Sequence, residues 1–391
     1  MDIVIVGAGI GGLAAAGCLL KRGHRVRVYE QAHELGEVGA GVQMSANAVK
    51  VLYHLGLKSQ LDVAGVKPKA FEFRRFDSGE ELHRIPLGDA HLERHGVPYY
   101  QVHRVDLHSQ LLAAVRALDP DAVATGVRAT GVVEDEHGVA VQLDQRPAVR
   151  AELLIGADGI KSVVRRHVIG EDAPVFTGQV VWRCMVPVER IPKDLLPDVV
   201  SSIFCGPNNH GVMYYLRGGS LLNFIGCVRR PWEEESWTAC RPWNELDEDY
   251  AGWHPMVRAV VENVDKDQCY RWALNNRKVA SNWSTRRTTL LGDAVHATLP
   301  YMAQGAAMAI EDAAVLARAI DLEVPLEQAL KIYQQHRVPR TSRVVDESTE
   351  MAELYQITDA EAMRQAFAER NIARSRNEWL YPYDPLTVAL T

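Results

Sequence analysis

The sequence predicts an α/β protein in which a Rossmann-like domain with a GxGxxG turn is interrupted by a mixed, antiparallel β-sheet domain and followed by C-terminal helices. Three observations predict this class. Residues 2–30 read as strand, glycine turn, helix and strand, residues 71–87 and 175–230 are rich in antiparallel strand patterns, and residues 305–351 follow a helical period. A parallel βαβ unit with antiparallel insertions indicates two discontinuous domains.

The N-terminal segment has the spacing of a βαβ unit. Residues 2–6 (DIVIV) form a short apolar run, the helical pattern LAAAGCLLKRG ends at Gly23, and RVRVYE reads as a second strand. The segment has no basic leader, carries Asp2 and is broken by glycines. We therefore expect a strand and a helix here rather than a signal peptide or a membrane span.

The turn between that strand and that helix has the pattern GxGxxG. Its glycines permit a tight turn, let the backbone approach a pyrophosphate, and let the helix pack on the strand. The helix N-terminus then offers N–H groups to the phosphates, and a carboxylate at the end of the second strand accepts hydrogen bonds from an adenosine ribose. The pattern predicts a dinucleotide, NAD or FAD, held by Gly7, Gly9, Gly11, Gly12 and Glu30.

The remaining elements follow along the chain. Helical patterns span 47–56 and 106–118, hairpins span 71–87 and 127–144, and a strand spans 152–159. The pattern turns helical from Trp253, and one more strand precedes Gly292. We expect a nucleotide-binding domain made of residues 1–70, 101–174 and 276–345, a second domain made of the hairpin insertion 71–100 and of 175–275, and a C-terminal helical segment, 346–391.

Composition limits the classes of function. The chain has 391 residues, 43 Lys and Arg against 50 Asp and Glu, and a formal net charge of −7, without a basic run. This balance argues against nucleic acid or a membrane surface as a partner and favours a small molecule. The six cysteines are scattered, without CxxC or HExxH patterns, so we expect reduced thiols, no metal site and a cytoplasmic location. The oligomeric state, monomer or homodimer, stays open.

Three further segments place polar residues beside predicted strands and helices. HRVDLH puts Arg104 just before a helix, and GADG ends a strand with Asp158. LLGDAVHATLPYMAQGA (290–306) runs from a strand through Gly292 and Asp293, then through a loop fixed by Pro300, to a helix that begins near Gly305. Taken singly, Arg104 reads equally well as a surface arginine near a helix cap, and Asp158 as an ordinary turn residue.

In combination these segments resemble the flavin-dependent aromatic hydroxylases, the para-hydroxybenzoate hydroxylase-like group, over nearly the whole chain. The resemblance implies a single FAD. It implies that Arg104 and the Asp158 segment contact this cofactor and that Asp293, with Gly292 beside it, contacts the ribityl chain. We expect Gly305 to let flavin and backbone approach closely and the dipole of its helix to stabilise the anionic reduced flavin.

Finer matches, among them RIPLG, NHGVMYY and WLYPYD, are similar to the salicylate and 6-hydroxynicotinate monooxygenase branch. The resemblance implies that NADH or NADPH reduces FAD and that O₂ then forms a flavin C4a-hydroperoxide. Its distal oxygen passes to a hydroxylated aromatic or N-heteroaromatic carboxylic acid, with or without loss of the carboxylate. The chain departs from the family at PYMAQG, where PxxGQG is more common, and at Gln43, where 6-hydroxynicotinate enzymes have a histidine.

In that branch a histidine and a tyrosine four residues apart lie in the substrate pocket, and these are His210 and Tyr214 here. A phenolate is attacked more readily than a phenol, and a neutral histidine is a natural proton acceptor. We therefore expect His210 to accept the phenol proton and Tyr214 to hydrogen-bond the substrate or relay that proton. Without the resemblance, the two residues read as a turn histidine and a core aromatic.

Other residues receive weaker expectations. Gln43, His296 and Met302 are placed near the substrate, with His296 as a buried, satisfied histidine rather than an acid or base. The arginine pairs at 74–75 and 165–166 have two interpretations, a binding site for a substrate carboxylate or nicotinamide phosphate and a solvated face, of which we expect the solvated face. The aromatic residues at 379–383 are expected to cover the core. Two alternative functions stay open from the residues: an FAD-dependent oxidase or dehydrogenase without oxygen insertion, and a non-catalytic dinucleotide-binding regulator.

Overall fold

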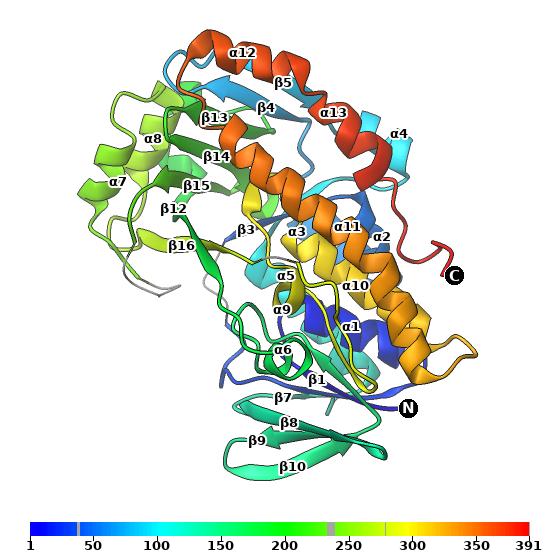
Figure 1. Cartoon of the computed structure of the whole chain (residues 1–391). Helices are drawn as coiled ribbons and strands as arrows, with labels where there is room; N and C mark the ends of the chain where they lie inside the picture. Colours follow the sequence, from blue (N-terminus) through cyan, green and yellow to red (C-terminus); the bar gives the residue numbers. More distant parts are fainter. Residues whose placement is uncertain (37–39, 233–238, 278, 391) are drawn as a thin grey trace.

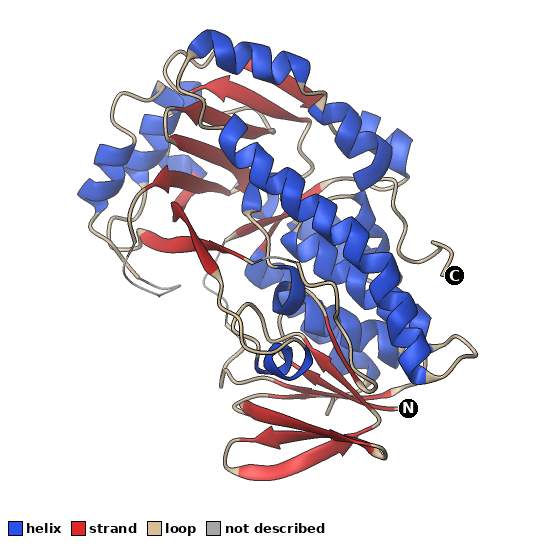
Figure 2. Ribbon diagram, viewed as in Figure 1, coloured by secondary structure: helices blue, strands red, loops and turns tan. Residues whose placement is uncertain are grey.

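The computed structural model describes residues 1–36, 40–232, 239–277 and 279–390. Two large sheets lie at opposite ends of the molecule, and the helices between them connect the two (Figures 1 and 2). The long helix α11 (Leu326–Leu354) runs from the edge of one sheet down along α10 (Gly305–Ile320) towards the other. A predicted α/β class with C-terminal helices is therefore confirmed.

The N-terminal segment forms the centre of a five-stranded sheet of order β17-β11-β1-β2-β7, paired in parallel throughout. Because the strands are parallel, their carboxyl ends meet at one edge, where open α/β sheets bind ligands. The GxGxxG turn, Glu30, Asp158 and Gly292 all follow this edge. The strands are β1 (Asp2–Val6), β2 (Arg25–Tyr29), β7 (Val123–Ala124), β11 (Leu153–Gly156) and β17 (Thr288–Leu290).

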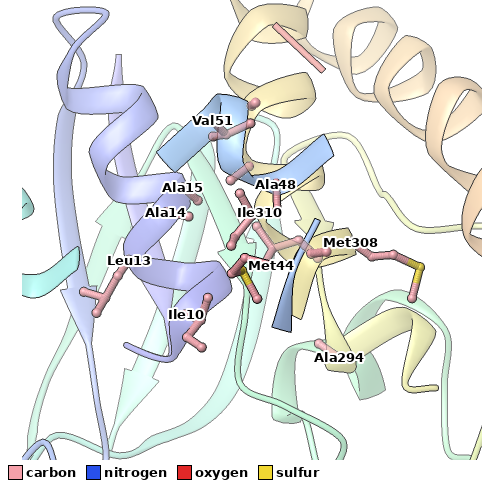
Figure 3. Close-up of a cluster of buried hydrophobic side chains, with 14 of the residues drawn as sticks. Ile10, Leu13, Ala14, Ala15, Met44, Ala48, Val51, Ala294, Met308 and Ile310 are labelled. Atoms are coloured by element: carbon pink, nitrogen blue, oxygen red, sulfur yellow. The ribbon is translucent and has the colours of Figure 1, made fainter. Parts of the chain in front are cut away.

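Small side chains let the helices of this domain pack closely. Helix α1 (Ile10–Leu20) contacts α5 (Arg104–Leu118) and α10, and α10 also contacts α2 (Ala46–His54). Figure 3 shows α1, α2 and α10 presenting short side chains to one another, among them Ala15, Ala48 and Ile310. A Cβ on Gly11 would come within 3.0 Å of the Ala309 Cβ, so this glycine allows α1 to approach α10.

The second large sheet is seven-stranded and mixed, with order β16-β12-β15-β14-β13-β4-β5 and one parallel pair, β13 with β4. One face packs on α7 (Trp243–Asp249) and α8 (Pro255–Asn263) through apolar side chains such as Trp182 and Phe224. The strands are β4 (Ala70–Arg75), β5 (Glu81–Pro86), β12 (Val175–Pro187), β13 (Ser201–Gly206), β14 (Asn209–Leu216), β15 (Leu221–Arg229) and β16 (Tyr270–Asn276).

Two small sheets and several short helices complete the described part of the chain. One sheet joins β8 (Ala129–Asp135), β9 (Gly138–Leu143) and β10 (Arg146–Ala151), and the other joins β3 (Gly41–Met44) and β6 (Tyr100–His103). The remaining helices are α3 (Lys58–Ala64), α4 (Asp89–His95), α6 (Val163–Val168), α9 (Asp293–His296), α12 (Ala360–Glu369) and α13 (Ile372–Ser375). Short turns are η1 (Val188–Arg190), η2 (Lys193–Leu195), η3 (Arg217–Gly219), η4 (Pro300–Met302) and η5 (Arg376–Leu380).

The structure adds elements that the sequence patterns do not reveal. β10 is short and highly charged, and β16 is an edge strand within a stretch expected to be helical. The expectation of a solvated Arg165 is wrong: its guanidinium is buried against Asp172. No helix in the described ranges is long and apolar enough to cross a membrane. The exact domain boundaries stay a prediction.

Candidate active site

The glycines of the turn after β1 are of two kinds: some are required by the packing of the fold, and one is not. Gly7 has a φ of +103°, and a Cβ on Gly7 or on Gly12 would overlap a neighbouring backbone carbonyl oxygen. These two glycines are required by the fold itself. A Cβ on Gly9 would meet no protein atom within 4 Å, so the fold alone does not require that glycine. Open space at Gly9, at the uncapped start of α1, fits a pyrophosphate.

Glu30 stands at the same edge in a fixed orientation. Its two carboxylate oxygens accept hydrogen bonds from the backbone N–H groups of Ala8 (2.8 Å) and Ala32 (2.9 Å). Each oxygen retains a lone pair for a further donor. A surface hollow adjoins this position, lined by Gln31, Ala32, His33, Gly126, Arg128, Asp144, Gln145 and Arg146.

Asp158 and Arg104 lie at the same edge, and each is held there by a different kind of hydrogen bond: Asp158 by its side chain and Arg104 by its backbone. The Asp158 carboxylate accepts hydrogen bonds from the backbone of Val163 (2.7 Å) and from the Ser162 hydroxyl, so it anchors the start of α6. Arg104 is half-buried as the first residue of α5, and its backbone N–H donates to Ala40 just before β3. Asp158 thus shapes the turn that packs on Gly7, and a direct contact with a cofactor stays a prediction for both residues.

The Gly292–Asp293 turn leaves an acidic group open. Asp293 is exposed, and no hydrogen bond or ion pair of its carboxylate is found within the described residues. Gly292 has a φ of +61°, which an L side chain rarely adopts. A Cβ on Gly305 would lie 3.6 Å from the nearest atom, a methyl of Thr298, so the protein leaves room beside the start of α10.

A buried charge network holds this turn in place. The Asp312 carboxylate accepts hydrogen bonds from the Gly292 N–H (3.0 Å), from His296 (2.5 Å) and from Arg337 (2.6 Å). Burial raises the pKa of Asp312, but His296 and Arg337 outweigh it and hold that pKa at about 2. His296 therefore supports the turn through Nε2, but the expectation of a fully satisfied histidine does not hold, because its buried Nδ1 has no hydrogen-bond partner in the described residues. His296 does not line the cavity described below.

The same network continues to the neighbouring carboxylate. Glu311 binds Arg337 and Arg340 and accepts from Asn47, whose amide also donates to Gln304 at the start of α10. Burial raises the pKa of Glu311, but Arg340 and Arg337 outweigh it, so the pKa lies below its ordinary value. α2, α10 and α11 are thus tied together directly behind the Gly292 and Gly305 positions.

A cavity lies between the free face of the seven-stranded sheet, the loop at 300–303 and the C-terminal segment. About 480 Å³ of this region is not filled by protein atoms, and part of that space is open to solvent. Gln43, Pro300 and Met302 line it, as does His210. The other lining residues are Phe71, Ser201, Ile203, Val212, Ile225, Cys227, Tyr301, Ala303, Tyr355 and Arg376.

His210 is a neutral imidazole in this cavity. The residue is 1% exposed, and burial lowers its pKa to about 3. Arg229 donates to Gln356 Oε1 (2.6 Å) and cannot accept a hydrogen bond, so the Gln356 amide nitrogen must face His210 Nδ1, 3.4 Å away. Nδ1 is therefore the acceptor nitrogen, and the hydrogen of the neutral ring is on Nε2.

Tyr214 lies on the same face of β14, two positions beyond Val212, but its ring turns towards β3. A Cβ on Gly41 would overlap the Tyr214 hydroxyl, and Tyr214 does not line the cavity. Burial raises the pKa of this tyrosine, so it stays protonated at neutral pH. The structure thus brings His210, Gln43 and Met302 together and leaves Tyr214 beside them.

Sequence reasoning missed much of the cavity wall. Ser201, Tyr355 and Arg376 line it from three distant parts of the chain, and no local motif surrounds them. Tyr301 donates to Gln179, which also accepts from the Gln356 amide (3.0 Å), and this chain of hydrogen bonds reaches His210. Among these residues, only His210 and Tyr301 lie in segments that the sequence motifs single out, residues 209–215 and 290–306.

Comparison with known proteins points to FAD as the cofactor. Residues 1–348 match the family described as "FAD binding domain". The 3-amino-4-hydroxybenzoate 2-monooxygenase PtmB3 of Streptomyces platensis is 35% identical over 99% of this chain and 97% of its own. The 3-hydroxybenzoate 6-hydroxylase of Polaromonas naphthalenivorans is 36% identical over 98% and 96%. The 6-hydroxynicotinate 3-monooxygenase of Bordetella bronchiseptica is 35% identical over 88% and 89%.

A solved structure shares the whole fold. Klebsiella pneumoniae HpxO complexed with FAD and uric acid superposes with a TM-score of 0.86 at 29% identity, covering 96% of this chain and 95% of that one. The open space at Gly9, the unpartnered carboxylate of Asp293 and the room at Gly305 fit this cofactor. The chain belongs to the FAD-binding family of flavin-dependent aromatic hydroxylases, enzymes that use FAD with NADH or NADPH as co-substrate.

Proposed function

We propose that this monooxygenase hydroxylates a ring that carries both a hydroxyl and a carboxylate, a hydroxybenzoate or a hydroxypyridine carboxylate. The observation that carries the proposal is the cavity, in which a buried neutral histidine faces a mostly apolar and aromatic wall. The names of the three relatives support it, since each acts on a hydroxylated ring acid.

The overall reaction balances without a protein nucleophile. One ring C–H, O₂, NAD(P)H and a proton give a ring C–OH, NAD(P)⁺ and water. Bound FAD supplies the reduction of O₂ and the transfer of one oxygen atom. The protein binds the cofactor and the ring, excludes water and polarises the ring hydroxyl.

We assign the cofactor contacts as follows. Gly9 and the start of α1 would hold the pyrophosphate, since no protein atom occupies the space there. The Glu30 carboxylate would accept from the adenosine ribose, and the Asp293 carboxylate would accept from the ribityl chain. Gly7, Gly11, Gly12, Asp158 and Gly292 act through the backbone shape of the site. Arg104, Pro300 and Gly305 border the cofactor.

His210 faces the ring hydroxyl in this proposal. Because Nδ1 accepts from Gln356, the imidazole donates its Nε2 hydrogen to the substrate oxygen and stabilises the ionised form of that oxygen. Ionising a phenol with a pKa near 10 at pH 7 costs about 4 kcal/mol, and a charge-assisted hydrogen bond recovers about 1.5–3 kcal/mol of it. With its hydrogen on Nε2, His210 donates to the ring oxygen and does not also accept the phenol proton at that nitrogen.

The test is turnover of the purified, yellow holoenzyme. NADH and NADPH oxidation is followed against hydroxybenzoates, hydroxypyridine carboxylates and urate, and products are weighed by mass spectrometry. A product heavier by one oxygen identifies simple hydroxylation, and replacement of CO₂ by oxygen identifies the decarboxylative reaction. If every ring acid yields only H₂O₂, or if urate alone is hydroxylated, the proposed substrate class is wrong.

The role of His210 has its own test. His210→Ala should lower hydroxylation by about 10²-fold or more, as for general acid or base residues, with an unchanged flavin spectrum. The matched control is His254→Ala, a half-buried histidine on the opposite face of the same sheet, where it caps α8. Unchanged turnover of the His210 variant at neutral pH would remove this residue from the mechanism.

A further inference from the structure

One buried cation in the described residues has no anionic partner. Five arginines are almost fully buried there: Arg165, Arg271, Arg277, Arg337 and Arg376. The first four each form an ion pair with a carboxylate, on Asp172, Glu245, Asp172 and Asp312 in that order. Arg376 is 2% exposed, forms no ion pair, and its Nε has no hydrogen-bond acceptor.

The surroundings of Arg376 leave its charge uncompensated. The guanidinium stacks on the Phe71 ring, with Cζ 4.8 Å from the ring centroid, and it lies near the hydroxyls of Tyr99, Tyr355 and Tyr381. Burial raises the pKa of all three tyrosines, so they are neutral at pH 7. An arginine does not deprotonate in proteins, and an unpaired buried charge is costly to keep. Such a group calls for an anion that the chain itself does not supply.

The guanidinium lines the cavity that holds His210. The Tyr355 ring lies between the two, with its centroid 5.3 Å from that of His210 and its hydroxyl beside Arg376. A second donor stands on the same wall. Ser201 pairs with Phe71 in the sheet, lines the cavity, and its buried hydroxyl has no partner. Two donors without an acceptor, Arg376 Nε and the Ser201 hydroxyl, therefore both belong to residues that adjoin Phe71.

The backbone at Arg376 is also unusual. Arg376 opens η5, a π-helical turn in which the Tyr381 N–H donates to the Arg376 carbonyl over five residues (3.0 Å). Single π turns are rare and occur often at functional positions. Here the turn follows α13 directly and holds both Arg376 and Tyr381 inward, where the segment covers the end of the seven-stranded sheet (Figure 1).

We propose that Arg376 binds the carboxylate of the substrate, with the Ser201 hydroxyl as a second donor, and so selects ring acids over uncharged rings. The proposal rests on the proposed function, because it names the group that holds the acid while His210 faces the hydroxyl. A guanidinium pairs with a carboxylate in bidentate fashion, which fixes the ring orientation as well as its charge.

The test measures binding apart from turnover. Dissociation constants are read from the change in flavin absorption of the holoenzyme as 3-hydroxybenzoate or 3-hydroxybenzamide is added, and unreactive benzoate and benzamide form a second pair. Wild type should bind each acid at least about tenfold more tightly than its amide, since a charged hydrogen bond is worth that much or more. Arg376→Met should weaken binding of the acids by about 10- to 100-fold and binding of the amides by less than about threefold.

Two further variants separate binding from structure. Arg376→Lys keeps the charge and should recover part of the preference for the acid. Arg374→Met, two residues away with a side chain that is 68% exposed, should change neither constant. The melting temperature of Arg376→Met should be equal to or above that of wild type, because an unpaired buried charge is removed.

Each outcome decides the proposal. Equal binding of acid and amide by wild type, an equal loss of both in Arg376→Met, or a lowered melting temperature with no change in acid preference would overturn it. An enzyme that binds benzoate over benzamide through Arg376 but oxidises no ring acid would disprove the proposed function and leave the anion site standing.

Discussion

Replacing Arg337 by methionine should unfold the protein at a clearly lower denaturant concentration. Arg337 is fully buried, and its guanidinium binds Glu311 (2.7 Å) and Asp312 (2.6 Å). Arg337→Met removes one cationic partner from each of two buried carboxylates, Glu311 and Asp312. Breaking a buried ion pair on one side typically costs about 3–5 kcal/mol, a large part of the usual stability of about 5–15 kcal/mol.

The same change alters the response to acid. The pKa of Asp312, about 2 in the folded protein, is below the ordinary value of about 3.9. A carboxyl with a depressed folded pKa contributes stability that is complete above the unfolded pKa, and this stability is lost as pH falls through the folded pKa. The contribution is about 2–3 kcal/mol, present above about pH 4 and lost towards pH 2. Without Arg337, burial raises the pKa of Asp312, so acid unfolding should begin at higher pH.

The assay is guanidinium unfolding at pH 7, with a parallel acid titration followed by circular dichroism and flavin absorption. Lys331→Met is the control, because Lys331 lies on the same helix in an exposed pair with Glu327, whose removal costs at most about 0.5 kcal/mol. FAD should also dissociate more readily from Arg337→Met, since Asp312 holds the Gly292 turn. Identical unfolding midpoints and acid profiles for the two variants would refute this reasoning.

Two further predictions concern the cofactor edge. Gly12→Ala should prevent folding, because its Cβ overlaps the Gly7 carbonyl, whereas Gly9→Ala should keep the melting temperature of the apoprotein and lose FAD affinity about tenfold or more. A Gly9→Ala protein that retains full flavin would show that the pyrophosphate lies elsewhere. Asp293→Asn should leave the apoprotein equally stable, since its carboxylate has no described partner, and raise the Kd for FAD by about fivefold or more. A lowered melting temperature of the Asp293→Asn apoprotein would contradict the inference that this carboxylate has no partner within the protein.

The turns at the carboxyl edge of the five-stranded sheet, the cofactor edge, were predictable because the features that require their glycines are local in sequence. Each turn follows a short strand, and a glycine at 7, 12 or 292 is demanded within a few residues of that strand by backbone contact or by a positive φ. Parallel pairing then brings separate turns to one edge, which the strand patterns imply. The Asp312 network was not predictable: an acidic pair in an otherwise apolar helix, with arginines three residues apart in the next helix, gives no sign of which groups meet.

The substrate cavity was predictable only where a segment bordered the cofactor. His210, Gln43 and Met302 line it, and their contact with a substrate stays a prediction, whereas the ring of Tyr214 is diverted by the approach of β3 at Gly41. In the strand pattern His210 and Tyr214 share one face, and that face continues past the cavity. Periodicity therefore assigns a side chain to a face but does not say which element covers it.

The buried arginine of the cavity, Arg376, could not be predicted from the sequence. The segment ARSRNEWLYPYD contains two arginines, and nothing in its pattern distinguishes the buried Arg376 from Arg374, which pairs with Glu378 on the surface. Two residues apart on a helical segment, the two side chains point to nearly opposite sides, and only the packing of Arg376 over Phe71 shows which of them is buried. The proposed FAD contacts do not include the Arg376 side chain, although Arg340 ties the backbone of this turn, at Trp379 and Leu380, to Glu311. Substitutions at Arg376 should therefore change which rings bind while the flavin spectrum of the ligand-free enzyme stays the same.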